Sequence, residues 1–189
     1  WQGPETVQGG NGGRLLFDQT GRLLVGVGLL NDRSAQADPD DVTGKLVAID
    51  PNGTPGQTPE ILSGPWNNPF AIARTSSGDV WVADNEPRDG DERLALGNDG
   101  MGPEVAAVLP ADSAPTGMTA VQISDGSEEL WVCTYNTRLL LRYARSGNGW
   151  SPIGTAATDC LLDVETLADG RVAYSTGDEI VVLDVGQGR

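Results

Sequence analysis

Short apolar segments joined by glycine-containing turns recur along this chain of 189 residues. Each copy consists of one apolar segment, a tight turn and a second apolar segment. Glycine suits such turns because it adopts positive φ without strain. The turn glycines are Gly21, Gly78, Gly126 and Gly170, and they separate segments 15–18 and 23–27, 70–73 and 80–83, 118–123 and 130–133, and 162–165 and 172–175. The pattern therefore predicts four β-hairpins, one in each repeat.

A further apolar segment follows three of the hairpins, at residues 46–50, 139–143 and 180–184. Three or four strands in every 45–50 residues or so are typical of the blades of a β-propeller. We therefore predict an all-β protein of the β-propeller type, in which residues 1–189 form a single propeller domain or the C-terminal part of one. The four expected blades cover approximately residues 11–62, 63–112, 113–154 and 155–189. A β-sandwich with regular hairpins is the alternative fold.

Composition excludes several classes of function. The chain has 27 acidic and 12 basic residues, a formal net charge of −15, and no histidine. Nucleic-acid binding is not expected, because phosphate contacts need a basic face. The absence of histidine excludes Ser-His-Asp and Cys-His nucleophiles and imidazole metal sites. No segment approaches the roughly 20 apolar residues of a membrane-spanning helix.

The segment from Asp84 to Glu92 carries the densest candidate chemistry. It also contains Glu86, Asp89 and Asp91. Calcium prefers six to eight oxygen ligands, and clustered carboxylates with backbone carbonyls can supply them. The alternative interpretation is a solvated acidic loop.

A second acidic cluster consists of Asp32, Asp38, Asp40 and Asp41. The Ala-Gln-Ala-Asp-Pro sequence within this segment predicts a loop. Its carboxylates are either contacts for a metal or a sugar, or part of a solvated loop.

Residues Trp66, Asn67 and Asn68 form a candidate ligand-binding segment. An indole stacks on the face of a sugar, and amide groups form hydrogen bonds with its hydroxyls. In the alternative interpretation, Trp66 fills the centre of the propeller and the two asparagines cap turns.

Two other groups of residues are interpreted as structural. Trp81 and Trp131 occupy equivalent strand positions in their repeats, so we expect both in the core between blades. Arg138, Arg142 and Arg145 follow a predicted strand, and we expect them on a solvated face.

Cys133 and Cys160 are the two cysteines of the chain and lie in neighbouring repeats. An even count in an exported protein allows one disulfide. Cys133 occupies a position where the other repeats have small residues, so a buried free thiol is the alternative.

The order of several short motifs resembles the soluble quinoprotein glucose/sorbosone dehydrogenases, also called aldose sugar dehydrogenases. The motifs are Asn11–Leu15, Ala35-Gln36 with Gly44–Leu46, Pro59–Ile61 with Asn68-Pro69, Glu86–Glu92 with Asn98–Gly100, and Ala114–Met118. The resemblance implies a six-bladed propeller that oxidises aldoses with pyrroloquinoline quinone (PQQ) and calcium. Because four blades are visible here, about two N-terminal blades would be missing from this chain, through cleavage, omission from the expressed piece or loss in evolution.

Several positions depart from the family pattern. Gly10 stands where the resemblance implies the catalytic histidine, so no catalytic residue is predicted. Trp66-Asn67-Asn68 replaces a cofactor-facing His-Arg-Asn segment. The pair of arginines that would hold the carboxylates of the cofactor corresponds to Cys160 and Leu162.

The resemblance also implies calcium ligands in the acidic loop. The cofactor calcium of the family is contacted by two backbone carbonyls, which correspond to Glu86 and Pro87 here. A carboxylate that helps to bind a second calcium corresponds to Glu92, next to Asp91.

These observations predict an exported bacterial propeller, secreted or in the cell envelope, that binds a sugar or another ligand without catalysis. An active PQQ-dependent aldose dehydrogenase with a rebuilt site is one alternative, and a protein–protein interaction scaffold is another. Four blades do not readily close a ring built for six, so we also expect exposed blade edges to pair with another chain.

Overall fold

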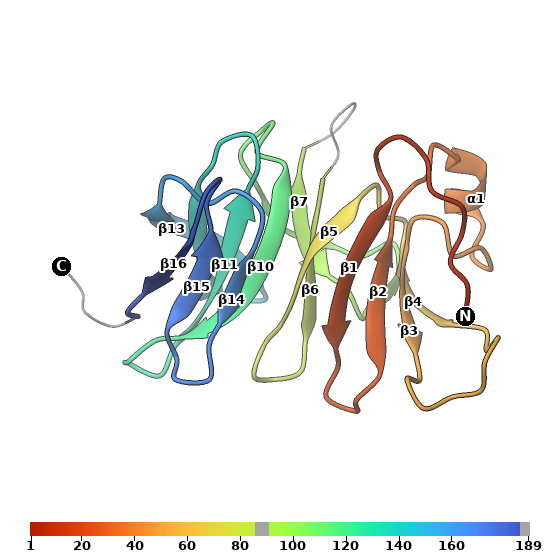
Figure 1. Cartoon of the computed structure of the whole chain (residues 1–189), viewed down its shortest axis with the longest axis horizontal. Coiled ribbons are helices and arrows are strands. Elements are labelled where there is room, and N and C mark those ends of the chain that lie inside the picture. Colours follow the sequence, from red (N-terminus) through yellow and green to blue (C-terminus); the bar gives the residue numbers. More distant parts are fainter. Residues whose placement is uncertain (86–90, 186–189) are drawn as a thin grey trace.

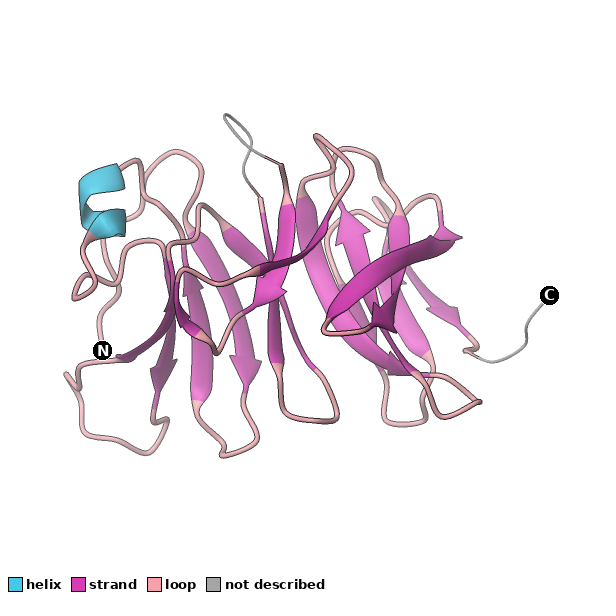
Figure 2. Ribbon diagram, turned by 180° about the vertical axis from the view of Figure 1, so that it is seen from behind, coloured by secondary structure: helices cyan, strands magenta, loops and turns pink. Residues whose placement is uncertain are grey.

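The computed structural model describes residues 1–85 and 91–185, which form four mainly antiparallel β-sheets and one short helix (Figures 1 and 2). Apart from one two-residue strand, each sheet uses consecutive segments of the chain, and we number the sheets as blades 1 to 4. Blade 1 contains β1 (Gly12–Phe17), β2 (Leu23–Val27), β3 (Lys45–Ile49) and β4 (Glu60–Gly64), with β8 (Gly100–Met101) parallel to β4 at its outer edge.

The other blades repeat this up-and-down order. Blade 2 contains β5 (Pro69–Arg74), β6 (Val80–Asp84), β7 (Arg93–Leu96) and β9 (Val105–Val108). Blade 3 contains β10 (Pro115–Gln122), β11 (Glu128–Thr134), β12 (Leu140–Ser146) and β13 (Gly149–Ala157). Blade 4 contains β14 (Val164–Thr166), β15 (Val172–Ser175) and β16 (Ile180–Leu183).

The first strands of the blades lie side by side in sequence order. β1 packs against β5, β5 against β10, and β10 against β14. The remaining strands of each blade fan outward from these inner strands (Figure 1). Four separate sheets arranged in this way confirm the β-propeller prediction, because a sandwich would contain two sheets packed face to face.

One apolar cluster fills each interface between blades. Leu24 and Val82 lie between blades 1 and 2, Trp81 between blades 2 and 3, and Trp131 and Tyr174 between blades 3 and 4. Trp81 and Trp131 are 3% and 5% exposed, which confirms the prediction that both belong to the core.

Blade 2 shows how the sequence produces two buried faces. On β6, Val80 and Val82 point toward blade 1, while Trp81 and Ala83 point toward blade 3. Side chains alternate between the faces of a strand, so a strand buried on both faces reads as a continuous apolar run. This explains why residues 80–83 gave a strong strand signal.

One expectation for local structure was wrong. The segment predicted as a loop after Gly28 contains α1 (Arg33–Ala37). The Asp32 carboxylate caps this helix by accepting hydrogen bonds from the amides of Ser34 and Ala35 at 3.1 and 3.0 Å. Such a cap satisfies backbone N–H groups that have no partner within the helix.

Two of the arginines that follow β11 also contact other side chains, in addition to being partly exposed. Arg142 makes a bidentate ion pair with Glu129, at 2.7 and 2.8 Å, and stacks on Trp131. Arg145 lies over the rings of Trp81 and Trp150. These side chains therefore cover tryptophans at blade interfaces, in addition to facing solvent.

Within residues 1–85 and 91–185, no helix is both long enough and apolar enough to cross a membrane.

Candidate functional site

Loops at one end of blades 1 and 2 bring together segments that the sequence singled out separately. The amide of Leu30 donates to the carbonyl of Gly10 at 3.3 Å, and the amide of Leu29 donates to the carbonyl of Asn67 at 2.7 Å. The amide of Gly12 donates to Oδ1 of Asn68 at 2.9 Å. The position implied for the catalytic base and the predicted ligand-binding segment are therefore connected by hydrogen bonds.

Backbone meets backbone closely in this region. A Cβ atom added at Gly28 would lie 1.8 Å from the carbonyl oxygen of Gly10, so no side chain fits there. Gly10 itself has a φ of +60°, and a Cβ atom added at Gly10 would meet nothing within 4 Å. The space beside position 10 could therefore hold a side chain, but glycine supplies none.

Asp84, at the end of β6, holds the backbone of the Asn67-Asn68 segment in place through hydrogen bonds. Its carboxylate accepts hydrogen bonds from the amides of Asn67, at 3.0 Å, and Asn68, at 2.7 Å. It also pairs with the Arg93 guanidinium, at 3.1 Å. Burial raises the pKa of Asp84 to about 6, while the two amides and Arg93 act in the opposite direction. The carboxylate is therefore used to hold the loop.

Trp66 lies in the core instead of facing a ligand. Its side chain is fully buried, its Nε1 donates to Oγ of Ser63 at 3.0 Å, and the Arg93 guanidinium lies 5.2 Å from the centre of its ring. The stacking role considered for this indole is not compatible with that placement. Trp66 packs in the interface between blades 1 and 2, which is a core position but not the centre of the propeller that the alternative interpretation gave it.

Three asparagine side chains retain polar atoms without partners among the described residues. Nδ2 of Asn67 donates to the carbonyl of Asn85 at 2.6 Å, which leaves Oδ1 of Asn67 available. Oδ1 of Asn68 accepts from Gly12, which leaves its Nδ2 available. Oδ1 of Asn85 is buried and has no hydrogen-bond partner. These atoms offer both acceptors and a donor, and none of the three groups carries a charge.

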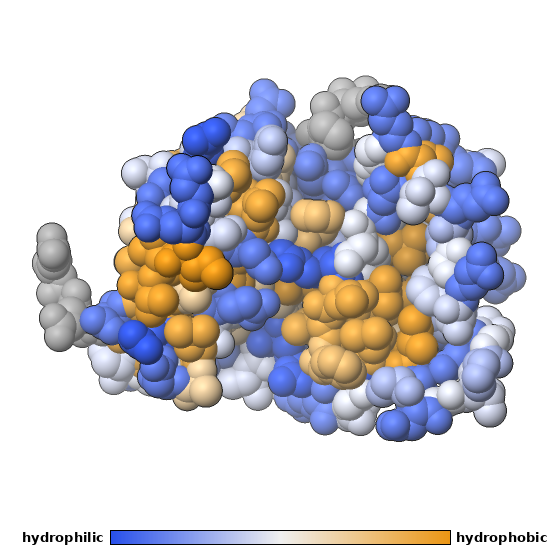
Figure 3. Space-filling view, in the orientation of Figure 1, coloured by the Kyte–Doolittle hydropathy of each residue, from blue (hydrophilic) through white to orange (hydrophobic). Residues whose placement is uncertain are grey.

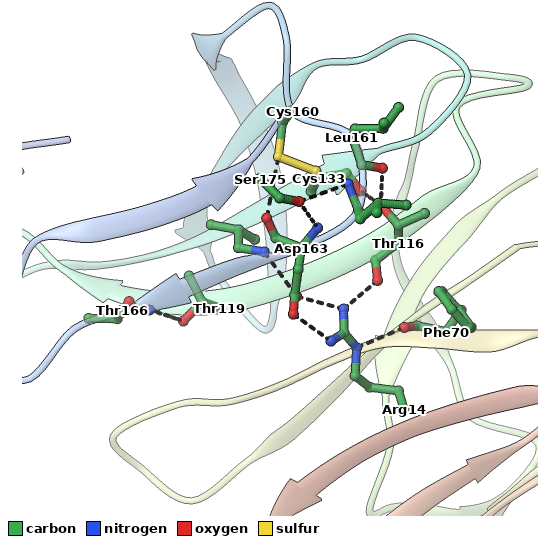
Figure 4. A network of polar contacts seen from close by, with 12 residues as sticks. Arg14, Phe70, Thr116, Thr119, Cys133, Cys160, Leu161, Asp163, Thr166 and Ser175 are labelled. Atoms are coloured by element: carbon green, nitrogen blue, oxygen red, sulfur yellow. Dashed lines mark hydrogen bonds and ion pairs between the residues drawn. A yellow bond between two sulfur atoms is a disulfide. The ribbon is translucent and has the colours of Figure 1, made fainter. Parts of the chain in front are cut away.

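Figure 4 shows a guanidinium that the sequence analysis did not single out and that bonds to groups on three other blades. Arg14 makes a bidentate ion pair with Asp163, at 2.7 and 2.9 Å. It also donates to the carbonyl of Phe70, at 3.1 Å, and to the carbonyl of Thr116. Arg14 from blade 1 thus contacts blade 2, blade 3 and the start of blade 4. The only sequence signal for this network was that Arg14 belongs to the family-like motif Asn11–Leu15.

The positions implied for the two cofactor-binding arginines are used differently here. Cys160 forms a disulfide with Cys133, with an S–S distance of 2.11 Å, and so joins the segment before β14 to β11. The Leu162 side chain is 51% exposed. Neither residue can donate hydrogen bonds from its side chain to a carboxylate as a guanidinium does.

Of the four residues predicted to bind calcium, the structure describes two, Asp91 and Glu92. Glu86 and Pro87 lie outside the described residues. Asp91 is exposed, whereas Glu92 is buried and accepts hydrogen bonds from the Ala114 amide, at 2.8 and 2.9 Å, and from Oγ of Ser113. Glu92 therefore ties blade 2 to the segment before β10.

The second acidic cluster has local structural roles. Asp32 caps α1, the Asp41 carboxylate accepts from the Thr43 amide at 2.8 Å, and the Asp38 carboxylate accepts from the Asp40 amide at 2.9 Å. Across residues 1–85 and 91–185, no group of three or more acidic or cysteine side chains is arranged to hold a metal ion.

The charges of the described site do not fit PQQ, the quinone that the resemblance implies. PQQ carries several carboxylates, and tight binding of carboxylates needs available guanidinium or ammonium groups. Arg14 is paired with Asp163, and Arg93 is paired with Asp84. Both arginines already have their anionic partners within the protein.

Comparison with known proteins finds relatives that share the sequence motifs and the propeller fold of this chain. The family model of glucose/sorbosone dehydrogenase matches residues 2–99, about half of the chain. Aldose sugar dehydrogenase YliI of Escherichia coli is 36% identical over 92 residues, which cover 43% of this chain and 25% of that protein.

Solved structures resemble nearly the whole chain. A glucose dehydrogenase superposes with a TM-score of 0.80 at 23% identity, and the match covers 97% of this chain and 64% of that one. The apo form of aldose sugar dehydrogenase from Escherichia coli gives 0.77 at 20% identity, with coverages of 94% and 65%. The PQQ-bound aldose sugar dehydrogenase of Streptomyces coelicolor gives 0.73 at 17% identity, with coverages of 92% and 61%. The shared fold is clear, and the chain spans less than two thirds of the length of these three relatives.

Proposed function

The chain belongs to the glucose/sorbosone dehydrogenase family, and from this premise we propose that it is an exported propeller that binds a sugar or a similar polyhydroxyl ligand without oxidising it. The ligand binds over the Asn67-Asn68 segment, at the end of blades 1 and 2 where this segment lies next to Gly10 and Gly12.

The observation that carries this proposal is the group of three neutral amides with unused polar atoms, on Asn67, Asn68 and Asn85. A buried acceptor without a partner in a native fold indicates a missing water or ligand. Neutral donors and acceptors suit hydroxyl groups, which both donate and accept hydrogen bonds.

Two features support binding without oxidation. Gly10 cannot accept a proton from a substrate hydroxyl, because glycine has no side chain. The nearby buried carboxylate of Asp84 is occupied by the amides of Asn67 and Asn68 and by Arg93. A neutral ligand requires no free guanidinium, so the ion pairs of Arg14 and Arg93 do not hinder it.

The disulfide between Cys133 and Cys160 supports the exported location. Disulfides persist in oxidising compartments such as the bacterial periplasm and are rare in the cytosol.

A calorimetric titration of the purified chain with a panel of aldoses and disaccharides tests the proposal. We expect saturable binding of at least one sugar, weakened at least tenfold by Asn67→Ala and unchanged by Asn148→Ala. Asn148 is an exposed asparagine in the turn between β12 and β13, so it serves as a matched control.

The same preparation is then incubated with PQQ and calcium and assayed with a dye acceptor. Turnover of any aldose would establish the alternative of an active dehydrogenase. Absence of binding across the whole panel would contradict the proposal and favour the interaction scaffold.

A further inference from the structure

A cavity of about 460 Å³ lies between the outer strands of blades 2 and 3. This volume is within the range of small-molecule binding sites. Exposed apolar side chains gather elsewhere, over β1 and over β16 (Figure 3), where Leu15 and Ile180 are 57% and 74% exposed. The cavity differs from those surfaces because it is concave and because polar groups surround an apolar floor.

The cavity is separate from the three asparagines of the proposed sugar site. In the pair formed by β6 and β7, Asp84 lies opposite Arg93, and this end of the pair supports the backbone of Asn67. Trp81 lies opposite Leu96 at the other end of the pair, and both of these side chains line the cavity. A ligand in the cavity would therefore use different residues from a sugar bound at the asparagines.

Apolar side chains form the floor of the cavity. Trp81 belongs to the buried cluster between blades 2 and 3, and Leu96 and Ala106 pack against that cluster. One wall is closed where β9 and β13 approach each other, since a Cβ atom added at Gly149 would lie 2.7 Å from the carbonyl oxygen of Ala106. An apolar group placed on this floor is removed from water, which is favourable in proportion to the area buried.

Two carboxylates on the rim have no cationic partner. Asp99 and Glu104 line the cavity, and neither forms a hydrogen bond or an ion pair with another described residue. Arg145, whose guanidinium lies 5.4 Å from the centre of the Trp81 ring, is instead paired with Asp79 at 3.6 Å. Charge complementarity therefore favours a ligand that brings its own positive group to this rim.

Trp81 also has an unused hydrogen-bond donor. Its side chain is 3% exposed, and its Nε1 has no acceptor among the described residues. Arg145 covers the ring, and the Trp150 ring meets it at 88° with 5.7 Å between centroids, so the ring already has its aromatic and cationic partners. A buried donor without a partner at the wall of a cavity indicates a missing acceptor. An oxygen atom of the ligand would supply it.

We propose that this cavity is a second ligand site, for a small organic amine with an apolar stem and an oxygen acceptor. The stem packs on Leu96, the ammonium group pairs with Asp99 and Glu104, and the oxygen accepts from Nε1 of Trp81. The lysine side chain of a peptide shares part of this chemistry, so the test includes both sources. This inference does not depend on the sugar proposed at the asparagines.

The test follows the indole N–H signals of the five tryptophans by nuclear magnetic resonance after sequential assignment. The probe is tyramine, which has an ammonium group, an aromatic stem and a phenolic oxygen. We expect the Trp81 signal to shift saturably with tyramine. The Trp131 signal should stay in place, because its N–H donates to Glu129 at 2.7 Å in a different blade interface. 4-Ethylphenol, which lacks the amine, should bind at least fivefold more weakly.

Variants test the role of the rim. Exposed ion pairs are individually weak, so both carboxylates are neutralised together in the double variant Asp99→Asn/Glu104→Gln. We expect it to bind tyramine at least fivefold more weakly, with the Trp131 signal unchanged as evidence of folding. Asp178→Asn, which removes the charge of an exposed carboxylate in blade 4, is the matched control and should change the affinity less than twofold. Tyramine binding should also weaken at least threefold between about 0.05 and 0.5 M sodium chloride, because salt screens exposed charges.

Three results would overturn the proposal. The first is no shift of the Trp81 signal at about 10 mM tyramine, which is tenfold above a weak dissociation constant of about 1 mM. The second is equal affinity for tyramine in the double variant and in Asp178→Asn. The third is binding of a capped Ala-Lys-Ala peptide without binding of tyramine, because the occupant would then be a protein side chain.

Discussion

Gly10, before β1, and Gly28, after β2, lie in neighbouring segments but tolerate substitution differently. A side chain at Gly28 collides with backbone atoms of Gly10 and Asn11, and backbone atoms cannot move aside as a flexible side chain can. A side chain at Gly10 meets open space, and its cost is that of a positive φ.

We therefore predict that Gly28→Ala lowers the free energy of unfolding by about 2 kcal/mol or more, because the backbone must shift. Gly10→Ala should lower it by roughly 1–2 kcal/mol. Urea denaturation of both variants measures the difference. Equal losses would mean that the loop at Gly28 is looser than described.

Arg14 and Asp163 form the second feature at this scale. The Arg14 side chain is 19% exposed and bonds to three other blades, so its loss leaves several acceptors without a donor. Arg171 and Asp169 form an ion pair of similar length, 2.8 Å, within one exposed turn.

We predict that Arg14→Ala lowers the free energy of unfolding by about 1–3 kcal/mol. Arg171→Ala is the matched control and should change it by less than about 1 kcal/mol, as is usual for exposed pairs. Chemical denaturation checks both values. A similar loss in the two variants would show that Arg14 does not connect the blades.

Tyr174 provides a test of pH dependence. Burial and the carboxylate of Asp159, to which its hydroxyl donates at 2.7 Å, raise the pKa of Tyr174 to about 12. Unfolded tyrosine titrates near pH 10. The folded protein therefore holds this proton more tightly, so the stabilisation is complete below pH 10 and is lost as the pH rises through 12.

Tyr174→Phe should remove one tyrosinate absorbance step near pH 12. It should also reduce the fall in the free energy of unfolding between pH 10 and 12, measured by urea denaturation. An absorbance step that disappears near pH 10 instead would contradict the described burial and hydrogen bond.

At the scale of elements, the disulfide stabilises the packing of blade 4 against blade 3. It connects β11 to the segment before β14, and blade 4 has three short strands in the described residues. Cross-linking two residues 27 apart in sequence restricts the unfolded chain by an estimated 3–4 kcal/mol.

We predict that replacing both Cys133 and Cys160 by serine increases hydrogen exchange most strongly in β14, β15 and β16. The increase in β1 and β2 should be at least tenfold smaller, because local opening is confined to contiguous units. Mass-spectrometric exchange of peptides from both ends measures this. A uniform increase would indicate that the chain opens as one unit.

The inner strands of each blade could be predicted from sequence, and the outer ones largely could not. β5 and β6 are apolar except at their last residues, Arg74 and Asp84, and are separated by a turn that contains Gly78, so both signals agree. β13 contains Pro152 and Gly154 and is mostly exposed, so it lacks the apolar alternation of a half-buried strand. α1 was missed because the capping signal at Asp32 precedes a helix of only five residues.

The candidate site likewise contains residues that could be predicted from the sequence and residues that could not. Asn67 and Asn68 could be singled out because they stand beside a recognisable proline motif. The contact between Arg14 and Asp163 could not, since it joins residues 149 apart in sequence. The burial of Trp66 depends on how blade 1 meets blade 2, which a linear pattern does not describe.

At the scale of the whole molecule, the net charge of −15 makes salt dependence a test that distinguishes an anionic ligand from a neutral one. A negative protein repels an anion, and salt screens that repulsion. A neutral sugar bound by amides has no such dependence.

We therefore predict that the affinity for the sugar changes less than twofold between 0.05 and 0.5 M sodium chloride, as measured by calorimetry. An affinity that rises severalfold with salt would indicate an anionic ligand and contradict the neutral site.

The Arg14 ion pair also constrains the order in which the molecule can be completed. Ribosomes add roughly 5–20 residues per second, so Asp163 is synthesised on the order of 10 s after Arg14. During that interval, the guanidinium has only the backbone acceptors of blades 2 and 3 available. Each blade can form from local contacts as it emerges, but the arrangement of blades 1 to 4 is fixed only after blade 4 has been made. The Arg14 guanidinium can pair with its carboxylate only then, so the packing of these four blades depends on a contact between residues 149 apart in sequence, and this step should be the slowest of their assembly.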